Sequence, residues 1–298
     1  MPYTDYNQVL QDLADNIREI NGSTASIRFV DMPDLIDGFV SPKISLTGNI
    51  SAQSGLERAR WRYKLIPCIG DTSGMTDMSY MCCNISNNNP LNPYTLDLSH
   101  FDTSNVTNMH GMFYNLYIYS LDLSSFDTSN VTDMAFMFSS LISYRGGNLD
   151  LSHFDTSNVT DMNNMFSDIF GFVGDPLMTL DVTGWDVSKV TDFEECFSIY
   201  STAFDKATLT ELDLSGWDTS NATNMTKMFA GSRFSKMWVP STFVATGCPT
   251  GCKPFENSSG SACDIYTNAS SATDQGWGNI DSTFTVHYNS THEDYENA

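Results

Sequence analysis

The sequence is poor in basic residues: Lys and Arg number 14 among 298 residues, against 36 Asp and Glu, which gives a formal net charge of −22. Such a surface repels nucleic-acid phosphates and anionic lipid headgroups, so neither is an expected partner. The chain also lacks the run of roughly 18 apolar residues that a membrane span needs, so no membrane insertion is expected. Its first residues contain no basic segment, apolar core or cleavage site, so ordinary secretion is not expected either.

Signatures of catalysis are missing as well. The chain has five His, and no nucleophile-elbow, zinc-protease, phosphate-loop or dinucleotide motif occurs in it. Among the seven Cys, the Cys248-x-x-x-Cys252 pair, with Cys263 further on, could pair or bind a metal. Because no His lies near them, buried or paired thiols are the favoured interpretation. We therefore expect no enzymatic activity, no cofactor and no metal site.

An internal repeat dominates the sequence. Five 18-residue blocks align without gaps and begin at Leu96, Leu121, Leu149, Leu180 and Leu212. The first reads LDLSHFDTSNVTNMHGMF, and a degenerate copy precedes it at residues 71–82. Repeats with a fixed internal pattern indicate a stack of similar units, none of which buries its apolar face alone.

Each position in the block has a predicted structural role. Leu96 and Leu98 alternate with polar residues, which predicts a short strand with one buried face. The aromatic residue that follows, Phe or Trp, is expected to anchor a corner, and the next Asp-Thr-Ser-Asn to bond nearby backbone. Val106, Met109, Met112 and Phe113 share one side of a predicted short helix. Cys196 stands where other blocks have Met and is interpreted as a core residue.

The segment before the repeats has a different pattern. Residues 1–40 predict a helical docking module, whose amphipathic helix presents Leu10, Leu13, Ile17 and Ile20 on one side. So short a module must bury this face on something, so self-association is one option. Residues 41–64 are expected to form a strand and linker, in which Arg58, Arg60, Arg62 and Lys64 lie on one side of a strand.

The repeat L-D-L-S-x-[FW]-D-T-S-N-V-T-[DN]-M-x-x-M-F closely resembles the BspA-type leucine-rich repeats of bacterial surface proteins over about residues 65–240. That resemblance implies a curved solenoid used for adhesion, without enzymatic activity. The segments Leu13–Thr24 and Asp31–Gly38 are similar to the start of many tailed-phage structural proteins. Together the two resemblances imply a virion appendage, docked on other virion proteins through its N-terminal module. A bacterial cell-surface adhesin is the alternative localisation and function, and a purely structural virion protein is a third.

The links between blocks vary from seven to fourteen residues and carry the candidate receptor-binding side chains. Insertions in such stacks gather on one edge, and Tyr-rich patches suit glycan or protein recognition. These candidates are Tyr117, Tyr119, Tyr144, Phe170, Phe172 and Tyr200. The alternative is that these rings seal the core on the return side. The strand aspartates, one per block from Asp97 to Asp213, are expected to form a column that calcium could bridge, although one carboxylate per turn supplies few ligands.

The fold class predicted from these patterns is α/β: a leucine-rich-repeat solenoid of about seven turns with an N-terminal helical docking module and a β-rich C-terminal cap. The expected boundaries are residues 1–40 for the docking module, 41–64 for the linker, 65–240 for the solenoid and 241–298 for the cap and tail. A strand is predicted over residues 283–288, followed by a polar end.

Overall fold

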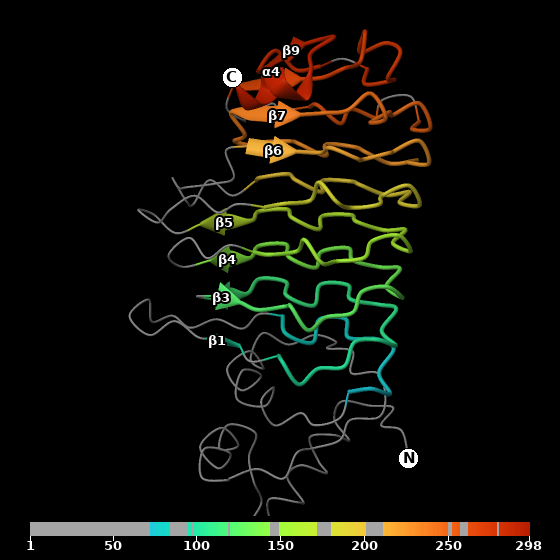
Figure 1. The fold of residues 1–298 in the computed structure, drawn as a ribbon, viewed down its shortest axis with the longest axis vertical. Helices are drawn as coiled ribbons and strands as arrows, with labels where there is room; N and C mark the ends of the chain where they lie inside the picture. Colours follow the sequence, from blue (N-terminus) through green and yellow to red (C-terminus); the bar gives the residue numbers. More distant parts are fainter. Residues whose placement is uncertain are drawn as a thin grey trace, which may run out of the picture.

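A computed structural model describes residues 72–83, 95–96, 98–118, 120–143, 149–171, 180–200, 211–249, 252–256, 262–278 and 280–298. In these segments the chain runs through successive coils stacked along the longest axis of the molecule (Figure 1). The predicted docking module at residues 1–40 and linker at 41–64 lie outside the described residues.

Short parallel strands join one coil to the next. Strands β1 (Thr95–Leu96) and β3 (Ser120–Leu121) pair in one sheet. Strands β2 (Tyr117–Ile118), β4 (Ile142–Ser143) and β5 (Phe170–Gly171) form a second. The third contains β6 (Glu211–Asp213), β7 (Lys236–Trp238), β8 (Cys263–Tyr266) and β9 (Phe284–His287) in that order. All pairs are parallel, because a full coil separates each strand from its partner in the same sheet.

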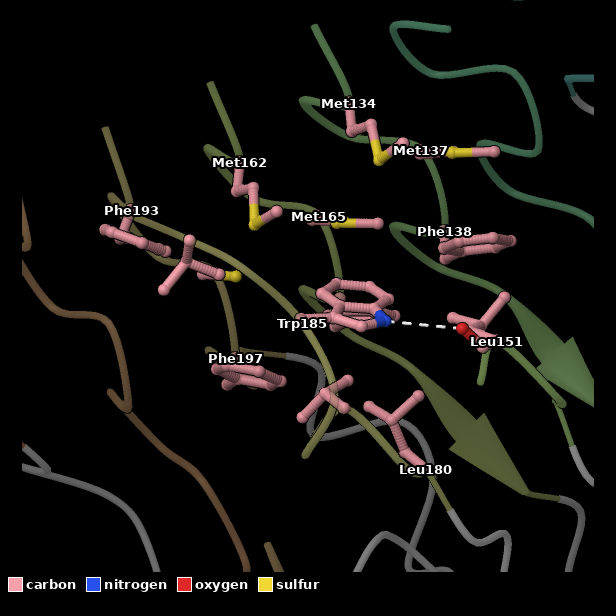
Figure 2. Close-up of a cluster of buried hydrophobic side chains, with 14 of the residues drawn as sticks. Met134, Met137, Phe138, Leu151, Met162, Met165, Leu180, Trp185, Phe193 and Phe197 are labelled. Atoms are coloured by element: carbon pink, nitrogen blue, oxygen red, sulfur yellow. Dashed lines mark hydrogen bonds between the residues drawn. The ribbon is translucent and has the colours of Figure 1, made fainter. Parts of the chain in front are cut away.

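The core contains two aromatic columns that contact each other, with sulfur and aliphatic side chains packed beside them. The column at the end of each block stacks face to face, with Phe113 on Phe138 at a centroid separation of 5.6 Å and Phe138 on Phe166 at 5.7 Å. In the second column Trp185 stacks on Phe154 at 6.4 Å. The methionines of neighbouring blocks lie in parallel beside these rings, as Figure 2 shows for two coils. The buried pattern of Leu, Val, Met and Phe that the repeat predicts is therefore observed.

The predicted short helix over Val106–Phe113 is wrong. Its residues form turns, because alternate N–H groups bond across to the next coil instead of back along their own segment. Met109 donates to the Asp133 carbonyl at 2.9 Å and Gly111 to that of Ala135 at 2.8 Å. Each such segment also holds one residue with positive φ, which bends the chain: Tyr80, Gly111, Phe136, Asn164, Glu195 and Lys227. A helix would direct every N–H to the fourth preceding carbonyl and could not make this ladder.

The third sheet continues without a break across residue 240, where the cap was predicted to begin. Trp277 repeats the arrangement of the block tryptophans, because its indole N–H donates to the Phe243 carbonyl at 2.9 Å as that of Trp217 does to Val182 at 3.0 Å. The strand predicted near the C-terminus is β9. The polar end beyond it contains α4 (His292–Glu296), which a capping box at Thr291 and Asp294 begins. Helix α4 packs against β7 and β8 (Figure 1).

A candidate binding surface on the outer side of the coils

Polar columns on the outside of the coils are fixed by hydrogen bonds to the backbone. In the strand column Asp122, Asp150, Asp181 and Asp213 each accept the N–H of the residue two positions on, at 2.8–3.1 Å. The carboxylates of this column therefore form local turns that shape the chain after each strand. Within the described residues, no three His, Cys, Asp or Glu side chains gather in a way that could hold a metal ion.

The corner column bonds neighbouring coils together, as its sequence pattern predicts. Asn130 donates from Nδ2 to the Ser104 carbonyl at 2.7 Å, and the buried Thr128 hydroxyl donates to the Asp155 carbonyl at 3.0 Å. The equivalent Asn residues at 105, 158 and 221 do the same, each toward the preceding coil. Lys189 interrupts the series, and its ammonium group donates to Asn158 Oδ1 at 2.8 Å. The exposed Asn side chains of this side are thus held in fixed positions.

A third column brings three carboxylates together. Asp133, Asp161 and Asp192 are parallel-bridge partners in successive coils, and all three are half-buried. Burial raises the pKa of Asp161, and the charges on its two neighbours raise it further, against the Asn163 N–H, which lowers it. At one end His110 Nδ1 lies 3.4 Å from Asp133 Oδ1. The three charges repel one another, because adjacent strands are only about 4.8 Å apart.

The structure places part of the predicted aromatic edge. The backbones of Tyr117 and Phe170 lie in one sheet, separated by β4, with Tyr117 in register with Ile142 and Ile142 with Phe170. Tyr200 is 46% exposed, and its hydroxyl donates to Glu195 Oε1 at 2.7 Å. Burial and then this bond raise the pKa of Tyr200. The candidates Tyr119, Tyr144 and Phe172 lie outside the described residues.

The predicted docking side chains also lie outside the described residues. They are Leu10, Leu13, Ile17 and Ile20 of the N-terminal module and Arg58, Arg60 and Arg62 of the linker. Their roles stay predictions that rest on the sequence alone.

Four rings that are not among the predicted site residues cluster around Gly111, and one of them, Tyr114, belongs to an aromatic link. Tyr80 contacts His110 and Tyr114 at centroid separations of 5.1 and 6.4 Å, and Phe136 contacts the same two rings at 5.4 and 6.5 Å. All four are half-buried and belong to three successive coils. The ring of Tyr80 lies where a Cβ at Gly111 would be, and Gly111 has a φ of +57°, so glycine is needed here.

Polar atoms connect this four-ring cluster to the carboxylate column. His110 Nε2 lies 2.9 Å from the Tyr80 hydroxyl, and its other nitrogen faces Asp133. The hydrogen bond to Asp133 raises the pKa of His110, although burial opposes it. A sequence signal for the cluster exists, because Tyr80, Gly111 and Phe136 occupy the same variable position of successive repeats. Glu195, which accepts the hydrogen bond from Tyr200, occupies this position three coils after Gly111. This outer column thus carries the half-buried rings of Tyr80 and Phe136, and the exposed Tyr200 bonds to its Glu195.

In the part of the chain that the structure describes, no helix is long and apolar enough to cross a membrane. The model of one protein family, described as "Mycoplasma protein of unknown function, DUF285", matches residues 76–202 and 172–238, which together span more than half of the chain. No curated protein and no solved structure matches the chain.

Proposed function

We propose that this chain, which belongs to the DUF285 family of proteins of unknown function, is a non-enzymatic binding protein built as a leucine-rich-repeat solenoid. In this proposal its coils present an outer surface to a glycan or protein on a host cell. The protein is an appendage of a phage virion, attached to other virion proteins through residues 1–40. Nucleic acid is not a partner, because the net charge of −22 repels phosphate.

The observation that carries the proposal is the outer column of positive-φ positions. Tyr80 and Phe136 occupy this column directly, and Tyr200 reaches it through Glu195. Partly exposed aromatic rings are side chains that glycan- and protein-binding surfaces use for contact, and Tyr80 and Tyr200 add a polar hydroxyl. The backbone beneath them is fixed by coil-to-coil bonds, such as the one from the Phe136 N–H to the Asn163 carbonyl at 2.8 Å. A ligand therefore meets rings that need little ordering before they bind.

Attachment to the particle is proposed for the segment that precedes the coils. The apolar side chains Leu10, Leu13 and Ile17 would pack on a virion protein or on a second copy of this chain. The alternating Arg58, Arg60 and Arg62 would contact an acidic neighbour, since they are opposite in sign to most of the chain.

A bacterial cell-surface adhesin is the second candidate, and the family description favours it because it names Mycoplasma proteins. Its binding surface would be the same column of rings, and only its attachment would differ. Fractionation separates the two: antibody to the chain should detect it in purified particles under the first proposal, and in the cell envelope of uninfected bacteria under the second.

Binding by the proposed surface is tested with full-length variants that keep the local backbone. Phe136→Asn and Tyr80→Asn place in these two coils the residue that Asn164 already supplies at the same positive-φ position. Together with Tyr200→Ala they should reduce saturable binding to host cells at least tenfold, with an unchanged melting temperature. Ser124→Ala, an exposed change on the strand side, is the matched control and should bind as the parent does. Undiminished binding by the ring variants would reject this surface, and no binding by the parent chain would favour a structural virion protein.

A further inference from the structure

Two cysteines, Cys248 and Cys252, lie in the coil that follows the last repeat block. The thiols of Cys248 and Cys252 lie near the same turn of the preceding coil, at Ala222 and Met225, and close enough to shift each other's pKa. Both residues are half-buried. A turn holds them together, because the Cys252 N–H donates to the Pro249 carbonyl at 3.1 Å. The Cys248 thiol also lies 3.9 Å from the Ala222 carbonyl.

Cys252 replaces a backbone acceptor in the ladder of hydrogen bonds between coils. In earlier coils the N–H of Met109, Met134, Met162 and Phe193 donates to a carbonyl oxygen of the next coil at 2.7–3.0 Å. The equivalent N–H of Met225 donates instead to Cys252 Sγ at 3.3 Å. A backbone N–H that elsewhere bonds to a carbonyl oxygen is here directed at sulfur. A thiolate accepts such a bond far better than a neutral thiol, since charge-assisted hydrogen bonds are the stronger ones.

We propose that Cys252 and Cys248 form a redox-active dithiol, in which Cys252 attacks small-molecule disulfides and Cys248 resolves the product into an internal disulfide. The structure presents the reduced state of the pair. This activity is independent of the proposed binding function, because it uses neither the outer column of rings nor the N-terminal module.

The first step breaks the S–S bond of the small disulfide. The Cys252 thiolate forms a bond to one sulfur, and the other leaves as a small thiolate. That thiolate takes the proton of the Cys248 thiol. Cys248 sulfur then attacks Cys252 Sγ and expels the second small thiolate. Two protein thiols are oxidised, and one small disulfide is reduced to two thiols.

The two thiols differ in acidity in the direction these roles require. The neighbouring Cys248 thiol lowers the pKa of Cys252 to about 6, although burial opposes it, and the Met225 N–H lowers it further. The pKa of Cys248 is raised by the same thiol pair and by burial. At neutral pH Cys252 is therefore the nucleophile, and Cys248 holds the proton until the second step.

Other thiols of the same chain supply internal controls. Cys196 is fully buried in the core, and burial raises its pKa. Burial raises the pKa of Cys263 to about 12. Neither should react while the protein is folded.

The test is alkylation of the native full-length chain by iodoacetamide between pH 5 and 9, with each Cys followed by peptide mass spectrometry. The rate at Cys252 should rise with a midpoint near pH 6. At that pH its higher thiolate fraction and lower nucleophilicity combine to about a tenfold advantage over a small free thiol. Oxidised glutathione should then convert the protein to a species with Cys248 linked to Cys252.

Two full-length variants separate the roles. Cys248→Ser keeps a hydrogen-bond donor beside Cys252 and should accumulate a mixed disulfide with glutathione at Cys252. Cys252→Ser should form none at Cys248. Melting curves confirm that both remain folded. Alkylation of Cys252 with a midpoint above pH 8, or the absence of a mixed disulfide in folded Cys248→Ser, would overturn the proposal.

Discussion

The carboxylate column gives the sharpest test of how the coils are held together. Replacing Asp161 by Asn should stabilise the protein at neutral pH, because Asp161 lies between Asp133 and Asp192 in successive coils. Asn already occupies this column at 108 and 224, where its Oδ1 accepts the N–H two positions on at 2.9 and 3.1 Å. The variant therefore keeps the turn that Asp161 makes with Asn163.

The magnitude follows from two like-charge neighbours. Directly opposed like charges on adjacent strands destabilise by roughly 0.2–1 kcal/mol per pair. Asp161 is only half-buried, so solvent screens part of the repulsion and the lower part of that range applies. For two pairs the gain is about 0.5 kcal/mol in the free energy of unfolding, or roughly 1–2 °C in melting temperature for a chain of this size.

The dependence on pH has a definite sign. The pKa of Asp161 is raised in the folded protein, so its contribution to stability is present below its unfolded pKa of about 3.9 and is lost as pH rises. The advantage of Asp161→Asn should therefore be largest at pH 7 and disappear near pH 3.5.

Asp127→Asn is the matched control, because this substitution should lower the stability at neutral pH instead of raising it. The Ser129 hydroxyl and then the Ser129 N–H lower the pKa of Asp127, so its stabilisation is present at neutral pH and is lost in acid. Asp127 is almost fully exposed, so this variant should cost no more than a few tenths of a kcal/mol at pH 7. Melting followed by circular dichroism at pH 7 and 3.5 measures both. Destabilisation by Asp161→Asn at pH 7, or an equal effect at the two pH values, would refute the reasoning.

Three further predictions concern single coils and are measured by thermal or urea unfolding. Lys227→Gly should stabilise the protein by about 1 kcal/mol, since Lys227 has a φ of +55°, which a residue with a side chain disfavours. Lys227→Val should destabilise it, because a β-branched residue disfavours positive φ even more strongly. Trp217→Phe should cost about 1–2 kcal/mol, because it removes the indole donor at 3.0 Å and leaves the Val182 carbonyl with only the Trp185 N–H at 3.3 Å. An unchanged stability would show that the Trp185 N–H alone satisfies this carbonyl. Gly111→Ala should cost about 2 kcal/mol, since its φ is +57° and the Tyr80 ring fills the space. The Gly111→Ala penalty should shrink in a Tyr80→Ala background, and a fully retained penalty would assign all of it to the backbone.

Much of the core was predictable from the repeat. Val106, Met109 and Phe113 are buried as their spacing indicates, because stacking identical coils places identical side chains on one another. The helix predicted for the same residues was wrong for a physical reason. Spacings of three, three and one fit a helical face and also fit a turned segment, and only bonds to the next coil distinguish them. Those bonds join residues that are more than twenty positions apart, which local periodicity does not reveal.

The binding surface was less accessible to sequence reasoning. The long aromatic links between blocks are visible in the sequence, whereas three of the four rings of the cluster, Tyr80, His110 and Phe136, lie inside repeat units. Its rings come from positions that vary from one repeat to the next, so no single block shows a pattern there. Tyr80 and Phe136 become neighbours only when the coils are stacked and Gly111 leaves room between them. The capping box at Thr291 and Asp294 is a local signal, by contrast, and could have predicted α4.

Binding of the purified full-length chain to intact candidate host cells, with unrelated cells as the reference, tests the central claim most directly. The chain should bind host cells saturably and in preference to unrelated cells, with or without calcium. It should be displaced by excess unlabelled parent protein but not by excess of the variant that lacks the rings of Tyr80, Phe136 and Tyr200. Equal binding to all cells, or none to any, would contradict a receptor-binding role for this surface.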